Sequence, residues 1–321
     1  MQICIFNPEH DLCLAKGRAH YMPPRSAVDF ARRGASLMSL LYPDALCTSL
    51  YDLPAINSQP KVNDRSGVNA QLSTLNFQLS TLIPWGWNLV LKQDLLDRGV
   101  PETLLPTDPQ IAAIRRLQHR ATLLPLQPDS QAIYDLRQLS AFNGSFCVLK
   151  APWSGAGRGL RWVSGGLTPH DIAWAEKVIR EQECVIVQPR YEVADDFALL
   201  YRIEGGTVHF VGYSLFQTSK GVYRGNLLLS DEGIRQRVGL DARKKAQIEH
   251  WIEETLLGHY EGPLGVDLFR TVDGDIHVSE LNLRHTMGFV AHAFLRLHPE
   301  AEGTLFTPDA IRPQGRVGGE S

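Results

Sequence analysis

The chain has 321 residues, of which 44% are hydrophobic and 21% charged, and its net charge is −3. Its length and apolar content support a sizeable core, divided over about two or three subdomains. A charge this close to balance gives no field that would favour nucleic acid or an anionic membrane, and no apolar run approaches the roughly 18 residues of a membrane span. We therefore expect neither nucleic acid nor a membrane as a partner.

The N-terminus has no basic region before its short apolar run, so it is not typical of a signal peptide. The five cysteines show neither the spacing of a zinc site nor that of a redox pair. These observations predict reduced, mostly buried thiols in a cytoplasmic protein.

The first hundred residues begin like a small α/β domain. Residues 2–6, QICIF, are an apolar run that predicts a strand, and residues 26–42 have helical spacing with Ser26 as the N-cap. Glu9, His10 and Asp11 follow the first strand. Ligands of α/β domains gather at the carboxyl ends of strands, so these three side chains are candidates for substrate contact. A polar, capped turn is the favoured alternative.

Residues 56–82 break this pattern. They are rich in Asn, Gln and Ser and contain the sequence QLSTL twice, at 71–75 and 78–82. Two copies are too few for a solenoid, so the composition predicts an inserted surface loop. Order resumes with Trp85-Gly86-Trp87, whose rings are more typical of buried packing than of a pocket wall.

Residues 107–125 predict a helix capped by Thr107 or Asp108, and stronger signals follow. Residues 168–183 form a marked helix in which Thr168 is the cap, Pro169 the first helical residue and Asp171 the closing acid of a capping box. The remaining predicted elements are strands at 146–150, 160–164 and 184–189, two strands within 197–217, a helix at 244–257, a hairpin at 264–283 and a helix at 288–298. A frayed tail is expected after Pro299.

The glycine-rich residues 154–159, SGAGRG, lie between two predicted strands. Lys150 precedes the glycines, and Arg158-Gly159-Leu160 stands where a P-loop has its lysine and hydroxyl, which excludes a Walker A loop. A dinucleotide loop must open a helix, whereas here a strand follows. Such a loop can instead act as a flap whose N–H groups cover a triphosphate, with Lys150 as a point charge. A surface hairpin with a nearby lysine is the alternative.

The hairpin at 264–283 carries a second constellation. Asp273-Gly274 predicts a two-residue turn, and in that register Asp267 lies opposite Glu280 while Asn282 points from the same face. Facing carboxylates destabilise a hairpin unless a cation bridges them. These oxygens suit Mg²⁺ bound beside phosphates. Because Ile276 and Val278 would share the face of Glu280, we expect that face to be covered. A solvated edge with unpaired acids is the alternative.

Together these segments resemble the ATP-grasp superfamily. Residues 148–163 are similar to the lysine strand and glycine flap of its biotin carboxylase branch, and residues 185–200 to the hinge between the two lobes that clamp ATP. GVDLF at 265–269, with SELNLRHTMG at 279–288, resembles the Asp and Glu-x-Asn metal pair that ends such domains. The order and spacing of all three segments fit over roughly residues 110–295.

The resemblance implies an α+β chain with an ATP-grasp fold, in which two α+β lobes clamp ATP, preceded by a small α/β pre-ATP-grasp domain. We place the N-terminal domain at residues 1–106, with its low-complexity insert at about 56–82. The lobe with the glycine flap follows at 107–187, the lobe with the metal site at 188–298, and a flexible tail at 299–321.

For the phosphates, the resemblance implies that Lys150 contacts the α- and β-phosphates and that Arg120 stands where many members place another phosphate-facing lysine. The flap over them consists of Ser154, Gly155, Gly157, Arg158 and Gly159. Arg284 would stabilise charge at the transferring phosphoryl group or hold a substrate carboxylate. Lys220 or Arg224 would act from a loop over the γ-phosphate.

For the nucleoside, the Pro189 carbonyl would accept from the adenine amino group and the Tyr191 N–H would donate to the ring. Proline has no N–H, so it can serve only the accepting role. Gln188 stands in this hinge where a glutamate is frequent, and Asp196, after a one-residue gap, matches an acid that binds ribose hydroxyls. The metal ligands carried over are Asp267, Glu280 and Asn282.

The chemistry that the resemblance implies is ligation with ATP and Mg²⁺, or Mn²⁺ in its place. A small-molecule carboxylate attacks the γ-phosphate to give an acylphosphate and ADP, and an amine or thiol then displaces phosphate. A small-molecule kinase and a non-catalytic ATP-binding sensor are the alternatives on the same fold. The identity of the substrates and the existence of a homodimer are left open.

Overall fold

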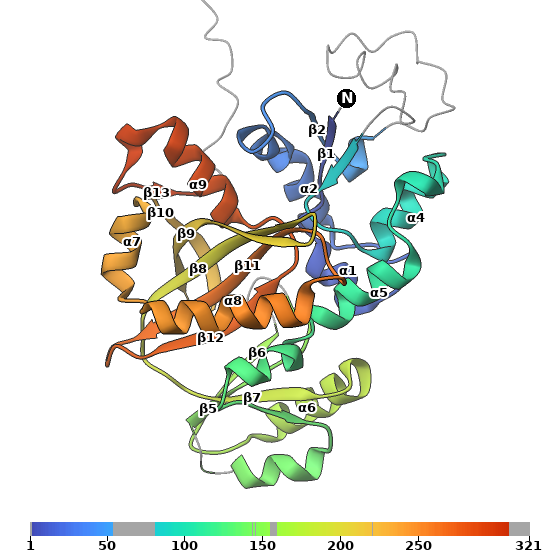
Figure 1. Ribbon diagram of the computed structural model, residues 1–321. Helices are drawn as coiled ribbons and strands as arrows, with labels where there is room; N and C mark the ends of the chain where they lie inside the picture. Colours follow the sequence, from blue (N-terminus) through green and yellow to red (C-terminus); the bar gives the residue numbers. More distant parts are fainter. Residues whose placement is uncertain are drawn as a thin grey trace, which may run out of the picture.

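The computed structural model describes residues 2–53, 81–142, 144, 146–154, 159–219 and 221–307. Within these residues the chain forms three sheets (Figure 1). One is a parallel N-terminal sheet, and the other two, with four and six strands, are antiparallel. This mixture of helices and sheets confirms the predicted α+β class.

The N-terminal sheet has the order β2-β1-β3. Its strands are β1 (Gln2–Phe6), β2 (Leu46–Ser49) and β3 (Thr81–Pro84). Its helices are α1 (His10–Lys16), α2 (Arg25–Gly34) and α4 (Leu89–Asp97), with the short 3-10 helices η1 (Ala35–Leu40), η2 (Leu50–Asp52) and η4 (Glu102–Leu104). The predicted first strand is confirmed, and its uninterrupted apolar run fits a central strand covered on both faces.

Two N-terminal predictions are wrong. Pro24 occupies the N-cap position of α2, and Ser26 lies inside the first turn. The insert was expected to reach residue 82, but Thr81 and Leu82 begin β3, because pairing with β1 overrides their polar sequence context. Residues 54–80, with the rest of the QLSTL duplication, lie outside the described residues. The predicted burial of Trp85 is confirmed.

The four-stranded sheet has the order β4-β7-β5-β6. Its strands are β4 (Gln131–Ile133), β5 (Phe146–Lys150), β6 (Leu160–Ser164) and β7 (Val185–Pro189). The helical segments of this region are α5 (Asp108–Leu117), η5 (Arg120–Leu126), η6 (Leu136–Phe142) and α6 (Pro169–Gln182). The strands that flank the glycine loop are therefore confirmed, and they pair directly with each other.

The helix caps in this region also match the sequence. Thr107 caps α5 and Thr168 caps α6, each within a capping box. The helix predicted at residues 107–125 is too long, however, because α5 ends at Leu117. Arg120 consequently does not lie on that helix but begins η5.

The six-stranded sheet has the order β12-β11-β8-β9-β10-β13. Its strands are β8 (Val193–Glu204), β9 (Thr207–Ser219), β10 (Val222–Leu227), β11 (Gly262–Thr271), β12 (Ile276–Asn282) and β13 (Leu305–Phe306). The helical segments are α7 (Asp231–Val238), α8 (Ala242–Leu256), α9 (Met287–Leu297) and η7 (Pro299–Ala301). Because β13 pairs with β10 and Phe306 is buried, the frayed tail predicted from Pro299 is wrong for residues 299–306.

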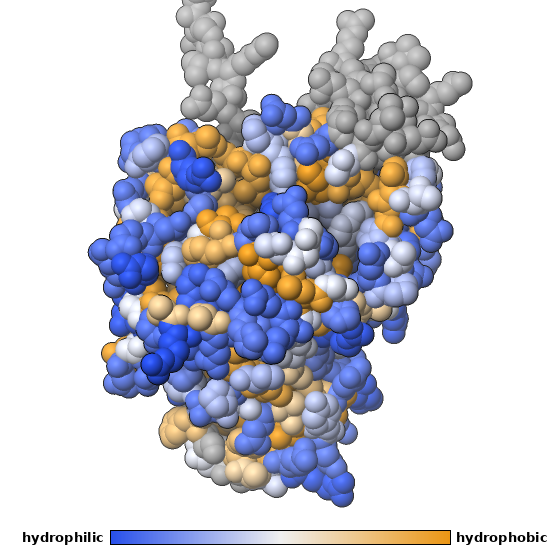
Figure 2. All heavy atoms as spheres, viewed as in Figure 1, coloured by the Kyte–Doolittle hydropathy of each residue, from blue (hydrophilic) through white to orange (hydrophobic). Residues whose placement is uncertain are grey.

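Helices α8 and α9 cover opposite faces of the six-stranded sheet. Leu199 packs with Ile252 of α8 in one core cluster, whereas Leu200, the next residue along β8, packs with Phe289 of α9 in another. Alternate side chains of a strand point to opposite faces, so β8 is buried on both sides. Helix α9 also packs against the N-terminal sheet through Val290, which joins the sheet to the rest of the molecule. Hydrophilic side chains dominate the outer surface over α8 (Figure 2).

Candidate active site

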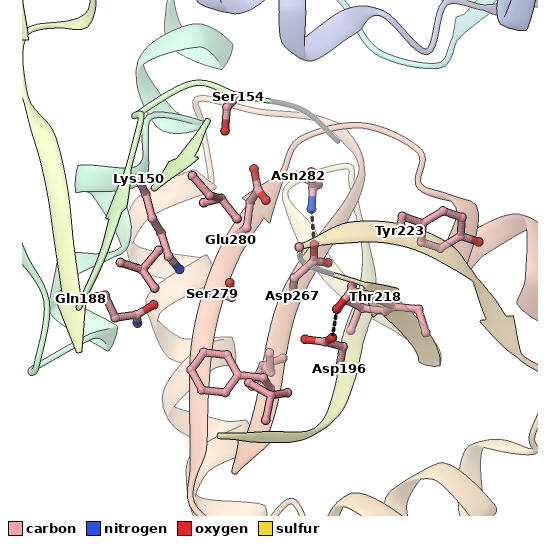
Figure 3. A pocket seen from close by; sticks show the side chains of 18 of the residues that line it. Lys150, Ser154, Gln188, Asp196, Thr218, Tyr223, Asp267, Ser279, Glu280 and Asn282 are labelled. Atoms are coloured by element: carbon pink, nitrogen blue, oxygen red, sulfur yellow. Dashed lines mark hydrogen bonds between the residues drawn. The ribbon is translucent and has the colours of Figure 1, made fainter. Parts of the chain in front are cut away.

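A cavity of about 1160 Å³ lies between the four-stranded and six-stranded sheets. One wall comes from β5, β6 and β7, the other from β8, β9, β11 and β12, and Asp11 of α1 reaches its edge. Most of the side chains that the sequence singled out line this cavity, although they come from segments far apart in the chain. Figure 3 shows them facing a common space.

Lys150 is the charged residue of the wall formed by β5. Phe146, Val148 and Lys150 alternate along the strand, so all three point into the cavity. Lys150 is 9% exposed, and within the described part of the chain its amine has no hydrogen-bond or ion-pair partner. Burial, together with the charge of Arg120, lowers the pKa of Lys150 to about 8. A buried, unpaired charge is costly, and an anionic ligand would supply the missing partner for this amine.

Arg120 links the root of the glycine flap to the hairpin. Its Nη1 donates to Ser154 Oγ at 2.7 Å and also to the Ala151 carbonyl, and its Nη2 donates to Glu280 Oε1 at 2.6 Å. Gly159 lies directly against Ser154, since a Cβ at Gly159 would be 2.2 Å from the Ser154 Cβ. Only glycine fits at this position. Residues 155–158, which include the predicted Gly155, Gly157 and Arg158, lie outside the described residues.

The two carboxylates predicted to face each other do so. Asp267 on β11 pairs with Glu280 on β12, and Gly265 pairs with Asn282. Asn282 Nδ2 donates to Asp267 Oδ2 at 3.0 Å, as drawn in Figure 3. Burial, and next the charge of Glu280, raise the pKa of Asp267 to about 7. The pair is therefore a place where a cation would relieve the repulsion.

The predicted register is nevertheless wrong near the turn. Thr271 N–H donates to the Asp275 carbonyl, so three residues rather than two form the turn, with Gly274 at φ +96°. A bulge between Asp267 and Leu268 then restores the predicted pairing.

The bulge also changes which side chains share a face. Val278 is fully buried in the core cluster with Leu281 rather than lying on the face of Glu280, so the predicted cover for that face is wrong. Ser279 and Glu280, although adjacent in sequence, both line the cavity.

Arg284 forms a bidentate ion pair with Asp11 of α1. Its Nε donates to Asp11 Oδ1 at 3.0 Å and its Nη2 to Asp11 Oδ2 at 2.7 Å. Burial alone would raise the pKa of Asp11, but the charge of Arg284 and its hydrogen bonds outweigh burial and lower it. Of the three polar residues after the first strand, Asp11 therefore reaches the site, whereas Glu9 and His10 are buried and do not line the cavity.

The other end of the cavity is mostly apolar. Val148, Leu160, Trp162, Leu268 and Phe269 line it. The hinge residues Gln188, Pro189 and Tyr191 lie at its edge, and Gln188 is 5% exposed. Figure 3 shows Gln188 beside Lys150. The Tyr191 ring packs on Phe269, with centroids 5.5 Å apart.

Asp196 lies on the opposite wall, where its Oδ2 accepts a 2.7 Å hydrogen bond from Thr218 (Figure 3). Burial raises the pKa of Asp196. An apolar slot that ends in polar groups can take a flat heterocycle with a sugar.

Of the two cations predicted to lie over the γ-phosphate, the structure describes Arg224 only. Arg224 is exposed and does not line the cavity, whereas its neighbour Tyr223 does, because alternate residues of β10 point to opposite sides. Lys220 lies outside the described residues.

Sequence reasoning missed the apolar lining, above all Val148, Trp162 and Phe269. The alternation of Phe146, Val148 and Lys150 was the signal that could have identified the β5 side of it.

Two features are absent from the described residues. No group of three or more His, Cys, Asp or Glu side chains could hold a metal there, so the candidate set is two carboxylates with one amide oxygen. None of the helices in the described ranges combines the length and the apolar character needed to span a membrane.

The sequence matches no known protein-family profile and no curated protein. Solved structures do match. Biotin carboxylase from Campylobacter jejuni, complexed with β-γ-ATP, has a TM-score of 0.52 at 13% identity, over 92% of this chain and 67% of that one. Carboxyaminoimidazole ribonucleotide synthase from Aspergillus clavatus, complexed with ATP, has a TM-score of 0.50 at 12% identity, over 89% and 70% of the two chains.

An Aspergillus clavatus N5-carboxyaminoimidazole synthase in complex with ADP and 5-aminoimidazole ribonucleotide has a TM-score of 0.50 at 13% identity. The match covers 92% of this chain and 75% of that chain. Identities this low show a shared fold. The chain therefore has the ATP-grasp fold, which confirms the predicted fold.

Proposed function

We propose that this ATP-grasp chain is an ATP- and Mg²⁺-dependent ligase that joins a small carboxylate to an amine. The observation that carries the proposal is one cavity that collects Lys150, Arg120 and the facing pair Asp267 and Glu280. The three matched structures are complexes with β-γ-ATP, ATP and ADP, and the ADP complex also contains 5-aminoimidazole ribonucleotide. This supports a cavity that takes a nucleotide and a second small molecule.

The size and polarity of the cavity fit a nucleoside triphosphate. Its volume of about 1160 Å³ exceeds the roughly 300–1,000 Å³ of most small-molecule sites, which leaves room for a second substrate. The adenine would lie in the apolar slot between Val148 and Phe269, with the ribose toward Asp196. The phosphates would then lie near Lys150, whose unpaired amine supplies a positive charge.

The facing acids fit a divalent cation. Asp267 is half-buried, its pKa is raised, and its hydrogen-bond partner among the described side chains is the Asn282 amide. Asp267, Glu280 and the amide oxygen of Asn282 would hold Mg²⁺, which prefers such hard oxygen ligands beside phosphates. When bound, the metal neutralises charge that develops on the transferring phosphoryl group.

In the proposed reaction, a substrate carboxylate oxygen forms a bond to the γ-phosphorus while the bond to the bridging oxygen of ADP breaks. The amine nitrogen then attacks the acyl carbon, phosphate leaves with the former carboxylate oxygen, and the amine loses a proton. Lys150 and Arg120 orient the phosphates and offset their charge. The glycine loop bounded by Ser154 and Gly159 would keep water from the acylphosphate.

The test is ADP release from Mg-ATP in the presence of pooled small carboxylates and amines, with Glu280→Gln as the control that keeps the side-chain shape. We expect release that depends on both pools and on Glu280. With an ¹⁸O-labelled carboxylate, one ¹⁸O should appear in the released phosphate. Absence of ADP release above the Glu280→Gln background, over broad pools, would contradict the proposal.

Product mass distinguishes the alternatives. An amide product supports the ligase, whereas a product that gains a phosphate identifies a kinase. Tight ATP binding with turnover that is equal in the wild-type protein and in Glu280→Gln would identify a sensor.

A further inference from the structure

Asp11 and Arg284 connect the N-terminal sheet to the metal-site hairpin. The two residues are 273 positions apart in sequence, and their side chains are only 12% and 16% exposed. Asp11 follows β1 at the start of α1, whereas Arg284 follows β12, two residues after Asn282. Their ion pair is therefore a tertiary contact between the first turn of α1 and the end of the hairpin.

The hydrogen bonds of Arg284 leave it almost no free donor. Nε donates to Asp11 Oδ1, Nη1 to the His285 carbonyl, and Nη2 to both Asp11 Oδ2 and Asn282 Oδ1. These are four of the five N–H groups of a guanidinium. A bidentate grip on a substrate carboxylate needs two parallel N–H groups. Arg284 can provide that grip only if Asp11 is displaced.

The same bonds fix the amide of Asn282. A guanidinium only donates, so the Asn282 atom at 2.8 Å from Arg284 Nη2 is the carbonyl oxygen, and the amide nitrogen faces Asp267. An amide oxygen has two lone pairs. One accepts from Arg284, and no described residue donates to the second, which a cation could therefore use. Arg284 thus orients a metal ligand rather than a substrate.

Asp11 is itself held from the opposite side. Gln118 Nε2 donates to Asp11 Oδ1 at 2.8 Å, and Gln118 Oε1 accepts from the Leu283 N–H at 3.2 Å. His10 and Asn88 extend this network into the N-terminal sheet, since Asn88 Nδ2 lies 3.3 Å from His10 Nδ1 and His10 Nε2 lies 3.4 Å from Gln118 Oε1. The carboxylate is therefore fixed before any ligand binds.

We propose that Asp11 is a positioning residue of the metal site, which holds Arg284 so that Arg284 presents the Asn282 amide oxygen to the cation. The inference rests on the proposed function, because it takes Asp267, Glu280 and Asn282 as the metal ligands. It assigns a role in the site to the N-terminal sheet. Partners that orient metal ligands typically change metal affinity by about 10- to 100-fold when mutated.

The test measures Mn²⁺ binding to the full-length protein with ADP, by electron paramagnetic resonance of free Mn²⁺. Asp11→Asn keeps the shape but turns one oxygen into an amide that opposes the N–H donors of Arg284 and Gln118. We expect its Mn²⁺ affinity to fall about tenfold. Glu9→Gln is the matched control, because Glu9 is a buried acid in the same loop that pairs with Tyr51 and not with Arg284. We expect no change for this control.

Two further measurements separate positioning from general damage. In an Arg284→Gln background, Asp11→Asn should have no additional effect on Mn²⁺ affinity. ADP affinity without metal should be unchanged in Asp11→Asn, which a misfolded variant would not preserve.

Three results would overturn the inference. The first is equal Mn²⁺ affinity in the wild type and Asp11→Asn. The second is an additive effect of the two substitutions. The third is tighter binding of a carboxylate substrate in Asp11→Asn, which would mean that Asp11 merely occupies Arg284 in place of substrate. A wild-type protein that binds no Mn²⁺ with ADP would overturn the proposed function as well, so the two failures are distinguishable.

Discussion

Lys150 and Arg284 lie at the two sides of the cavity, and they differ in how the protein compensates their positive charge. Lys150, on the four-stranded sheet, has no partner among the described residues, and burial lowers its pKa to about 8. Arg284, which follows β12, has a half-buried side chain, and its pairing with Asp11 outweighs the effect of burial and raises its pKa. A cation left without a partner costs folding free energy, so it points to a ligand that supplies the anion. A cation that the protein has already paired points to a structural or positioning role.

The largest effect is expected for the loss of the ion pair between Arg284 and Asp11. Arg284→Met leaves the Asp11 carboxylate buried without its cation, and breaking a buried pair in this way costs about 3–5 kcal/mol. Urea unfolding should show this loss in the free energy of unfolding. The double variant Asp11→Leu/Arg284→Met should recover part of the loss, since it also removes the Asp11 carboxylate, while Asp267 and Glu280 still lack the charge of Arg284. A loss below about 1 kcal/mol in the single variant would contradict the comparison.

Removing the charge of Lys150, which has no partner in the described part of the chain, should change the free energy of unfolding in the opposite direction. The pKa of Lys150 falls from 10.5 to about 8 on folding, so keeping the amine charged at pH 7 costs on the order of 3 kcal/mol. Lys150→Met should therefore raise the free energy of unfolding, while ADP affinity falls about 10- to 100-fold because a charge-assisted contact is lost. Calorimetric titration and urea unfolding measure the two quantities. A destabilised Lys150→Met protein would show that Lys150 has an unseen structural partner.

The same pKa predicts a pH dependence. Below about pH 8 Lys150 is charged in the nucleotide-free protein, and above that pH it loses its proton. Since phosphates bind the charged form, ADP affinity should be level below pH 8 and fall by up to about tenfold per unit above it. The unfolded chain keeps this proton up to a higher pH, so the contribution of Lys150 to stability rises between about pH 8 and 10.5. Lys150→Arg should abolish both trends, because arginine stays charged.

Arg120 pairs with Glu280 and also faces the cavity, so it combines features of Arg284 and Lys150. Its substitution should have the smallest effect. Its guanidinium contacts Ser154, the Ala151 carbonyl and Glu280 at once, which a lysine ammonium on a flexible chain cannot reproduce. Arg120→Lys should lower ADP affinity about threefold to tenfold, an effect of one ordinary hydrogen bond. Equal affinity in titration would mean that only the charge of Arg120 matters.

The sequence predicted the elements of this site wherever local chemistry decides structure. The helix caps Thr107 and Thr168 and the strands on either side of the glycine loop follow from interactions within a few residues. The predictions for the end of α5 and for the start of β3 were both wrong. The helix ends at Leu117 and the strand begins at Thr81 because of tertiary packing. The turn after Thr271 was also wrong, because a bulge elsewhere in the hairpin compensates for its extra residue.

What the sequence determined by itself is the chemistry available: a lysine before a glycine loop, and the two acids Asp267 and Glu280 on one hairpin. What only the tertiary structure decided is how each charge is compensated. Nothing local links Asp11 to Arg284, or Arg120 to Glu280, because these partners lie 273 and 160 residues apart. The free energy of a buried charge depends on the groups that surround it in space, so only the folded chain shows which cation is paired and which is left for a ligand.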